Sequence, residues 1–288
     1  MVARLYRIIF HTPNMTRAIK RKYPLHSLAK SITWKGSKLT YIVGRLFVDR
    51  DLKEDFFRAY AYFRWIDDIV DELNSTREDR ILFITRQDTL IRSLFSGDSA
   101  VDDLRPEEEL LVQLTQAPHK HSDNLRSFVE NMFAIIKFDS YRKDRTISSA
   151  ELDWYSQCLG RSVVDGLQYF IGNDHDYPKT ENQYSAAIAA HITHMLRDTI
   201  PDIANGFINI PRDVLPEQDI HTTDHPSVRS WVKGRVMLAR KHFQDGRKYI
   251  RSLQVKRCQL ASYLYCNQFE RILDIIERDD YVVRHVYG

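Results

Sequence analysis

Two pairs of aspartates are the part of this sequence best suited to chemistry. Asp67 and Asp71 form the first pair, and Asp198 and Asp202 form the second. Residues four apart on a helix project from one face, one turn from each other. Two carboxylates on one face of an apolar helix repel each other and lose solvation, so each pair predicts a cation nearby.

An arginine accompanies each pair. Arg64 stands three residues before the first pair, and Arg197 directly precedes the second. Carboxylate oxygens are hard ligands, which favours Mg²⁺ over Zn²⁺ or copper. Carboxylates alone would repel a diphosphate, and a bound Mg²⁺ reverses that sign. The pattern therefore predicts that both pairs face one apolar cavity, share Mg²⁺ ions and hold an anionic leaving group.

Two other interpretations of these residues compete with the Mg²⁺ site. A single Asp-x-x-x-Asp is usually an ion-paired helix surface, although two such motifs in apolar surroundings favour function. A different metal-site hypothesis uses His191, His194 and Asp198 as ligands at helical spacing. Iron–carboxylate bundles need Glu together with Glu-x-x-His pairs, which this pattern does not supply.

The elements that must position these residues are helices. Apolar residues recur at spacings of three and four, and no alternating run predicts a strand. Ser148 to Glu151 has the spacing of a helix start, and Pro201 is expected to kink the helix that carries the second pair. We expect one all-α domain spanning 1–288, a helical bundle around a central apolar cavity. The predicted helices are 50–73, 77–95, 106–116, 122–140, 149–170, 181–204, 227–253 and 256–279.

Composition narrows the class of protein. Hydrophobic residues make up 43% of the 288 residues, which is enough for a large core. A net charge of +3 argues against a nucleic-acid partner. No stretch has the roughly 20 apolar residues of a membrane span. The three cysteines lack metal-ligand spacing and indicate reduced thiols in a cytoplasmic protein.

The amino-terminal part is basic, and residues 1–48 contain no Asp or Glu. A solvated basic face is the simplest explanation. Peripheral attraction to an anionic membrane is a second, and would suit a lipid substrate. An organelle transit peptide is a third, although such segments are normally rich in Ser as well. Residues 1–30 are expected to be peripheral to the domain.

The two motifs resemble those of the squalene/phytoene synthase family, and the resemblance runs from about Ser37 to Tyr281. The run from Tyr60 to Asp71, Tyr-x-x-x-Arg-x-x-Asp-Asp-x-x-Asp, is similar to the first signature of the family. The run from Leu196 to Asp202, Leu-Arg-Asp-x-x-x-Asp, is similar to the second. Both occur in the family's order along the chain.

The resemblance implies a role for each matching residue. The four aspartates would bind roughly two or three Mg²⁺ ions that bridge to diphosphate. Arg64 and Arg197 would contact phosphate or fix the aspartates. Tyr60 would lie beside the diphosphate, Tyr155 would line the cavity, and Tyr41 would contact substrate.

The sequence also departs from the family's pattern. His191 and His194 stand where the family usually has Gln and Asn. They are expected either to pack within a helix or to place a ring nitrogen near the metal and the diphosphate. Gly160 to Val164 differs from the family's small-residue stretch, and Phe207 and Asn209 replace its Arg and Tyr.

The family's reaction is the head-to-head condensation of two prenyl diphosphates, such as farnesyl or geranylgeranyl diphosphate. It passes through cations that an apolar, aromatic-lined cavity must protect from water. The departures leave two alternatives: a terpene cyclase or prenyl-diphosphate hydrolase that uses one substrate, and a non-catalytic scaffold protein. The resemblance leaves NADPH use, chain length and oligomeric state open.

Overall fold

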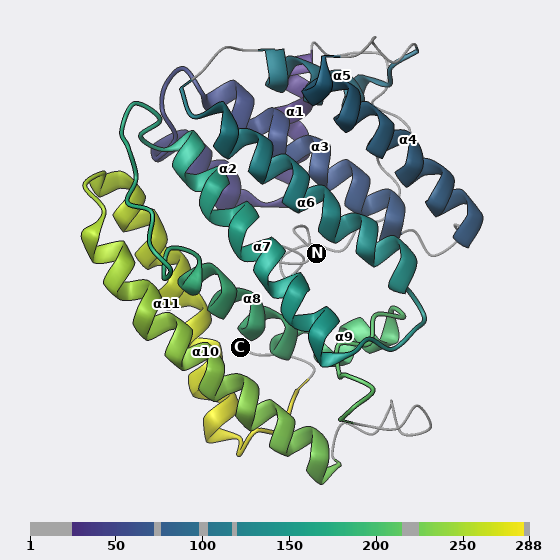
Figure 1. The fold of residues 1–288 in the computed structure, drawn as a ribbon, viewed down its shortest axis with the longest axis vertical. Helices are drawn as coiled ribbons and strands as arrows, with labels where there is room; N and C mark the ends of the chain where they lie inside the picture. The colour runs from purple at the N-terminus through teal and green to yellow at the C-terminus, as the bar shows by residue number, and fades with distance from the viewer. Residues whose placement is uncertain (1–24, 72–75, 98–102, 117–119, 215–224, 285–288) are drawn as a thin grey trace. The chain divides into compact units, whose positions relative to one another are not determined.

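A computed structural model of the chain describes residues 25–71, 76–97, 103–116, 120–214 and 225–284. Within these ranges the secondary structure is helical (Figure 1). The exception is one isolated bridge between Arg145 and Phe207. The predicted all-α class is therefore confirmed. The helices are α1 (Leu25–Gly36), α2 (Lys38–Leu46), α3 (Lys53–Asp71), α4 (Arg77–Ser96), α5 (Pro106–Gln116), α6 (Ser122–Arg142), α7 (Ser149–Phe170), α8 (Ser185–Arg197), α9 (Thr199–Ala204), α10 (Pro226–Ser252) and α11 (Lys256–Arg278).

The chain divides into two compact units. Unit 1 comprises Met1–Arg126 and Gln168–Asp174, and unit 2 comprises Ser127–Leu167 and His175–Gly288. Each unit holds one of the aspartate motifs. The single domain and the facing of the two motifs across one cavity both stay predictions.

Unit 1 is organised around α3, which packs against α1, α2 and α5. Phe57 and Ala61 of α3 form an apolar cluster with Ala29 of α1 and Leu110 of α5. These two α3 residues lie four apart, so they share the buried face of the helix. This packing leaves the end of α3 that carries the first motif in a fixed helical register.

A buried carboxylate joins α4 to α5 in the same unit. Glu108, whose side chain is fully buried, accepts bonds of 2.8 and 2.7 Å from Nε and Nη2 of Arg86. Gln87 donates a further bond of 2.7 Å, and its own side-chain oxygen accepts one from Tyr62 of α3. Burial alone would raise the pKa of Glu108, but these donors lower it, so the carboxylate is held ionised. The network therefore ties three helices of unit 1 together.

Unit 2 is organised around α8, whose thirteen residues are all buried. It packs against α10 and α11, which also pack against each other. A helix that is enclosed on every side needs apolar residues all round, and α8 supplies them with a run of Ala, Ile, Met and Leu. His191, His194 and Arg197 are the titratable groups of this buried helix.

The connector between α6 and α7 is bonded to the segment that follows α9. The amide of Asp144 donates to the carbonyl of Gly206 at 2.7 Å. The amide of Arg212 donates to the carbonyl of Ile147 at 2.9 Å. Gly206 has a φ of +81°, and a Cβ there would collide with Asp144, so the turn requires glycine. We refer to these two bonded segments as the connector clamp.

Several sequence predictions can be compared with this fold. The predicted helices 106–116 and 149–170 have the observed bounds, and Ser148 and Glu151 make the reciprocal bonds of a capping box. The predicted helix 181–204 is wrong at its start, because it begins at Ser185. It is interrupted at Asp198, within one turn of Pro201, where a kink was predicted. Helices α1 and α2 were not predicted. Residues 1–24 of the basic amino-terminal segment lie outside the described ranges. The three cysteines form no disulfide.

Candidate active site

The first motif occupies the last two turns of α3. Asp67 is buried, with 4% of its surface exposed, and Asp71 ends the helix. The predicted helical spacing of these two residues is thus observed. Tyr60 lies two turns earlier on the same helix and is also buried.

Arg64 makes its ion pair with the middle aspartate of this motif. Its Nη2 lies 2.6 Å from Oδ1 of Asp68, and its Nε donates to Oδ2 at 3.0 Å. Loss of solvation raises the pKa of Asp68, and the charges of Asp67 and Asp71 raise it further, against the opposing effect of Arg64. Three carboxylates and one arginine are thus gathered at the carboxyl-terminal end of α3.

Tyr41, the other predicted substrate contact of unit 1, lies on α2. Its ring packs against Phe57 at 5.3 Å and edge-on against Trp34 at 5.1 Å. The Arg45 guanidinium lies 6.0 Å from the ring centroid. Tyr41 is half-buried and so has one side in the core of unit 1.

The second motif spans a break between two helices. Helix α8 ends at Arg197, Asp198 has φ −96° and ψ 9°, and α9 begins at Thr199. The amide of Asp198 donates to the carbonyl of His194 at 3.0 Å, and the amide of Asp202 donates to the carbonyl of Asp198 at 2.8 Å, so these two helical bonds meet at Asp198. Pro201 lies in the first turn of α9, where a missing amide hydrogen is tolerated.

Asp198 is held by two cationic or polar side chains from the last turn of α8. Arg197 donates to both carboxylate oxygens, at 2.6 and 2.8 Å. Nε2 of His194 lies 2.9 Å from Oδ2. Burial would raise the pKa of Asp198, but His194 and Arg197 together hold it well below its ordinary value. Asp198 is therefore ionised and fixed in orientation.

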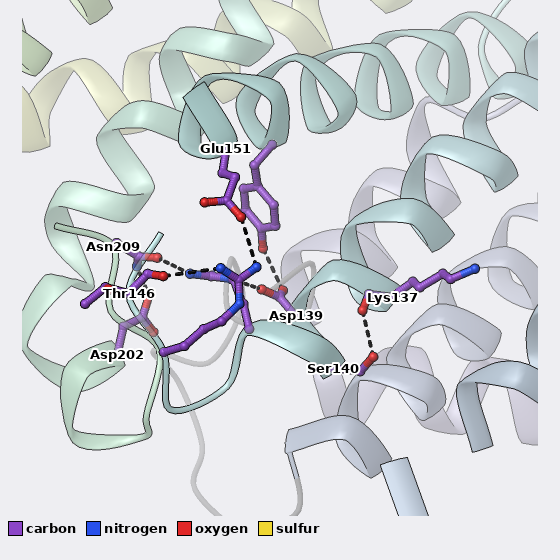
Figure 2. A network of polar contacts seen from close by, with 10 residues as sticks. Lys137, Asp139, Ser140, Thr146, Glu151, Asp202 and Asn209 are labelled. Atoms are coloured by element: carbon purple, nitrogen blue, oxygen red, sulfur yellow. Dashed lines mark hydrogen bonds and ion pairs between the residues drawn. The ribbon is translucent and has the colours of Figure 1, made fainter. Parts of the chain in front are cut away.

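Asp202 belongs to a buried network centred on Arg142, which is 1% exposed. Figure 2 shows Asp139, Asp202 and Asn209 of this network. The side-chain amide of Asn209 donates to Oδ2 of Asp202 at 2.7 Å. The oxygen of Asn209 accepts from Nη1 of Arg142 at 2.9 Å, and Nε of Arg142 donates to Asp139 at 2.6 Å. A guanidinium without solvent contact is thus bonded to one acid directly and to another through an amide. We call these four residues the arginine network.

Tyr155 completes this network from α7. Its hydroxyl donates to Oδ2 of Asp139 at 2.6 Å, and its ring centroid lies 5.0 Å from the Arg142 guanidinium. Phe138 and Phe207 also lie within cation–π distance of that guanidinium, at 5.7 and 5.4 Å. The tyrosine predicted to line a cavity is fully buried beside the group that fixes the second motif.

His191 and His194 are both enclosed within α8, with exposures of 0% and 1%. Nδ1 of His191 lies 3.1 Å from Oγ of Ser156. Burial lowers the pKa of His191, and the neighbouring charges of His194 and Arg235 lower it further, so this ring is neutral. Among the described residues, no three His, Cys, Asp or Glu side chains are grouped as a metal site, and this holds for His191, His194 and Asp198 and for the motif aspartates alike.

The structure thus places the predicted residues in two groups. On unit 1, Tyr60, Arg64, Asp67 and Asp71 lie on α3, and Tyr41 lies on the neighbouring α2. On unit 2, the second motif is joined to Tyr155 and the two histidines. The sequence analysis missed Asp139 and Arg142, and it listed Asn209 only as a departure. An Asp-x-x-Arg pair at helical spacing is the one signal that the sequence carries for them.

The comparison with known families decides what kind of protein carries these groups. The family model for squalene/phytoene synthase matches residues 35–287. The chain belongs to the squalene/phytoene synthase family.

Curated relatives of this family member are phytoene synthases. The chloroplastic phytoene synthase of an Oncidium hybrid cultivar is 26% identical over 84% of this chain and 59% of the relative. The 15-cis-phytoene synthase of Synechocystis is 24% identical over 90% of this chain and 78% of the relative. The chain thus spans about three fifths of the length of the first of these relatives.

Solved structures show the same fold. Squalene synthase HpnC from Alicyclobacillus acidocaldarius is 20% identical, with a TM-score of 0.67 over 90% of this chain and 95% of that one. A dehydrosqualene synthase in complex with ligand is 16% identical, with a TM-score of 0.62 over 90% of this chain and 88% of that one. In the part of the family member that the structure describes, no helix is both long and apolar enough to cross a bilayer.

Proposed function

We propose that this chain is an enzyme that uses prenyl diphosphates and joins two of them head to head. The observation that carries the proposal is the pair of Asp-x-x-x-Asp motifs in a chain of the squalene/phytoene synthase family. An arginine pairs with Asp68 within the first motif and with Asp198 of the second. The phytoene synthases among its relatives support the same reaction class. The product would be a squalene- or phytoene-like hydrocarbon.

The donor chemistry of both motifs fits Mg²⁺. Asp67 and Asp71 offer oxygen ligands one helical turn apart, and Asp198 and Asp202 offer a second set of oxygens that are already oriented. Hard oxygen donors with no thiolate among them suit Mg²⁺ better than a softer metal. When bound, Mg²⁺ would supply positive charge for the diphosphate that leaves the substrate.

The chain's own residues would share the remaining work. Arg64 lies in the first motif, and Arg197 lies in the second. Each would bind phosphate oxygens or keep the carboxylates of its own motif in place. Tyr60 would flank the diphosphate. The arginine network would hold Asp202 in one orientation, so that little reorganisation is needed when the substrate binds.

One observation favours a second candidate, an enzyme that uses a single prenyl diphosphate. Phe207 and Asn209, at positions where the family has Arg and Tyr, are each 1% exposed. Asn209 is committed to Arg142 and Asp202, and Phe207 packs against Arg142. Neither side chain is therefore placed to contact a second substrate. A cyclase or a hydrolase would not need a second substrate.

Purified protein incubated with Mg²⁺ and farnesyl or geranylgeranyl diphosphate would distinguish these candidates. Head-to-head coupling gives a thirty- or forty-carbon hydrocarbon, and the assay should include NADPH in one arm because squalene formation requires a reductant. A cyclic fifteen- or twenty-carbon product, or a free alcohol, would establish the single-substrate reaction instead. Absence of pyrophosphate release with every chain length would overturn both and leave a scaffold role.

A further inference from the structure

Helix α2 of unit 1 exposes a stripe of apolar side chains at the protein surface. Leu39, Ile42 and Leu46 are 47%, 46% and 67% exposed. Their spacing of three and four places them along one stripe of the helix. A helix on the surface of a globular protein normally buries such a stripe and exposes its polar side chains. In α2 this arrangement is reversed.

The inward stripe of α2 consists of small or polar residues. Ser37 caps the helix by accepting a bond of 3.0 Å from the amide of Thr40, and both residues are buried. Gly44 follows on the same face, and a Cβ there would lie 2.7 Å from ring atoms of Phe56. The close approach of α2 to α3 therefore depends on a residue without a side chain, and the orientation of α2 is fixed by packing.

The surface around the apolar stripe is basic. Trp34 of α1 is 48% exposed, and the ammonium of Lys38 lies 5.6 Å from its ring centroid. Lys35, Lys38 and Arg45 are exposed. Residues 34–46 contain no acidic side chain. Every exposed residue in this range is either apolar or cationic, and we call these exposed residues the α2 patch: Trp34, Lys35, Lys38, Leu39, Ile42, Arg45 and Leu46.

We propose that the α2 patch docks this protein on the surface of an anionic lipid bilayer. Apolar side chains enter the boundary between head groups and acyl chains, while Lys and Arg pair with lipid phosphates and carboxylates. Tryptophan is favoured at this depth because its ring is apolar and its N–H is polar. The α2 patch combines apolar side chains, cationic side chains and a tryptophan on α2 and the last turn of α1.

The charge of the patch selects a bilayer over a second copy of this chain. Two copies meeting through the same patch would oppose their own Lys35, Lys38 and Arg45, and like charges in an interface are unfavourable. An anionic bilayer neutralises these charges instead. The binding mode is peripheral, because α2 has nine residues and lies on the protein surface. The proposal is independent of the reaction that the enzyme performs.

Vesicle sedimentation with the full chain tests the proposal. We expect the wild-type protein to bind vesicles of phosphatidylcholine with about a third phosphatidylserine, and to bind pure phosphatidylcholine much more weakly. Raising the salt concentration should weaken binding, since it screens the cationic side chains. The triple variant Leu39→Gln, Ile42→Gln, Leu46→Gln should lose roughly tenfold or more in partition coefficient. Lys35→Gln should lose about fivefold.

A matched control comes from unit 2. Met237, Leu260 and Leu264 are 63%, 51% and 55% exposed, so a second triple glutamine variant removes a similar apolar surface elsewhere. This control should bind vesicles as the wild type does. Far-UV circular dichroism should show both triple variants to be folded.

Three results would overturn the proposal. The first is that the wild type does not bind the anionic vesicles, and the second is that both triple variants lose binding equally. The third is that the wild type sediments as a dimer that the α2 triple variant dissociates, with no vesicle binding by either. Trp34→Phe gives an independent readout, because quenching of tryptophan fluorescence by brominated lipid should fall sharply in this variant and persist in Trp154→Phe.

Discussion

The two aspartate motifs have the same spacing but are built differently. On α3, Asp67 and Asp71 follow each other along an uninterrupted helix, and the neighbouring Arg64 pairs with the partly exposed Asp68. On α8 and α9 the helix is interrupted at Asp198. There, Arg197 and His194 hold one carboxylate, and Asn209 holds the other.

The same sequence pattern can therefore give two sites that differ in how firmly the protein fixes their carboxylates before a ligand binds. In the first motif, loss of solvation raises the pKa of Asp68, and the charges of Asp67 and Asp71 add to that rise. The second motif has its charge balanced by protein groups, and the pKa of Asp198 is lowered. We therefore expect the first motif to depend more on an added cation, and the second to contribute more to the stability of the fold.

The largest expected effect concerns activity and should be common to both motifs. Asp67→Asn and Asp198→Asn should each lower Mg²⁺-dependent pyrophosphate release by on the order of a thousandfold, because each removes a charged oxygen ligand. Far-UV circular dichroism should stay unchanged. Asp153→Asn, which removes the same charge from an exposed ion pair with Arg235, serves as the control. Full activity in either motif variant would refute the metal-site assignment.

The next effect separates the motifs by stability. Arg142→Met should lower the free energy of unfolding by about 3–5 kcal/mol, because it leaves the buried Asp139 without its charged partner. Arg64→Met should lower it by less than about 1 kcal/mol, since the side chain of its partner Asp68 is 45% exposed. Urea unfolding of both variants measures the difference. Equal losses would mean that the two motifs are equally integrated into the fold.

A smaller loss of stability is expected at the amide that connects Arg142 to Asp202. Asn209→Leu keeps the approximate volume of the side chain but removes both of its bonds. The free energy of unfolding should fall by about 1–3 kcal/mol, because two buried polar side chains each lose one hydrogen bond. Unfolding curves measured beside those of Arg142→Met test whether the arginine network acts as a unit. A double variant whose loss equals the sum of the single losses would show that it does not.

The smallest effect is expected for Pro201→Ala. At the helix break Arg197 donates to Asp198 and His194 lies close to it, and Pro201 occupies a first-turn position that tolerates proline. The free energy of unfolding should therefore change by less than about 1 kcal/mol. A thermal melt suffices for this comparison. A gain of several kcal/mol would show that the proline, and not the side-chain bonds, maintains the break.

Local patterns in the sequence predicted much of the fold. The bounds of 149–170 follow from apolar periodicity and from the Ser148–Glu151 cap, both of which act within a few residues. Helix α2 was not predicted, although Leu39, Ile42 and Leu46 have helical spacing, and the sequence does not show that this apolar stripe is exposed. Periodicity locates an apolar face but does not specify what that face contacts.

The candidate site shows the same limit. Asp67 and Asp71 could be paired from their spacing alone, since both lie on one helix. The bond between Arg142 and Asn209 joins residues 67 apart in the chain, and no local pattern encodes it. The interruption at Asp198, by contrast, lies within one turn of Pro201, from which a kink was predicted. Long-range polar contacts were therefore the part that sequence reasoning missed.

The connector clamp has a consequence for how this region folds. Its amide bonds join Asp144 to Gly206 and Ile147 to Arg212, so both segments must be in place before either bond forms. We expect the amide hydrogens of Asp144 and Arg212 to exchange with solvent in one shared opening event. Closing a loop of some sixty residues is slow compared with helix formation. Asp202 would consequently reach its final orientation late, after the helices on either side have formed.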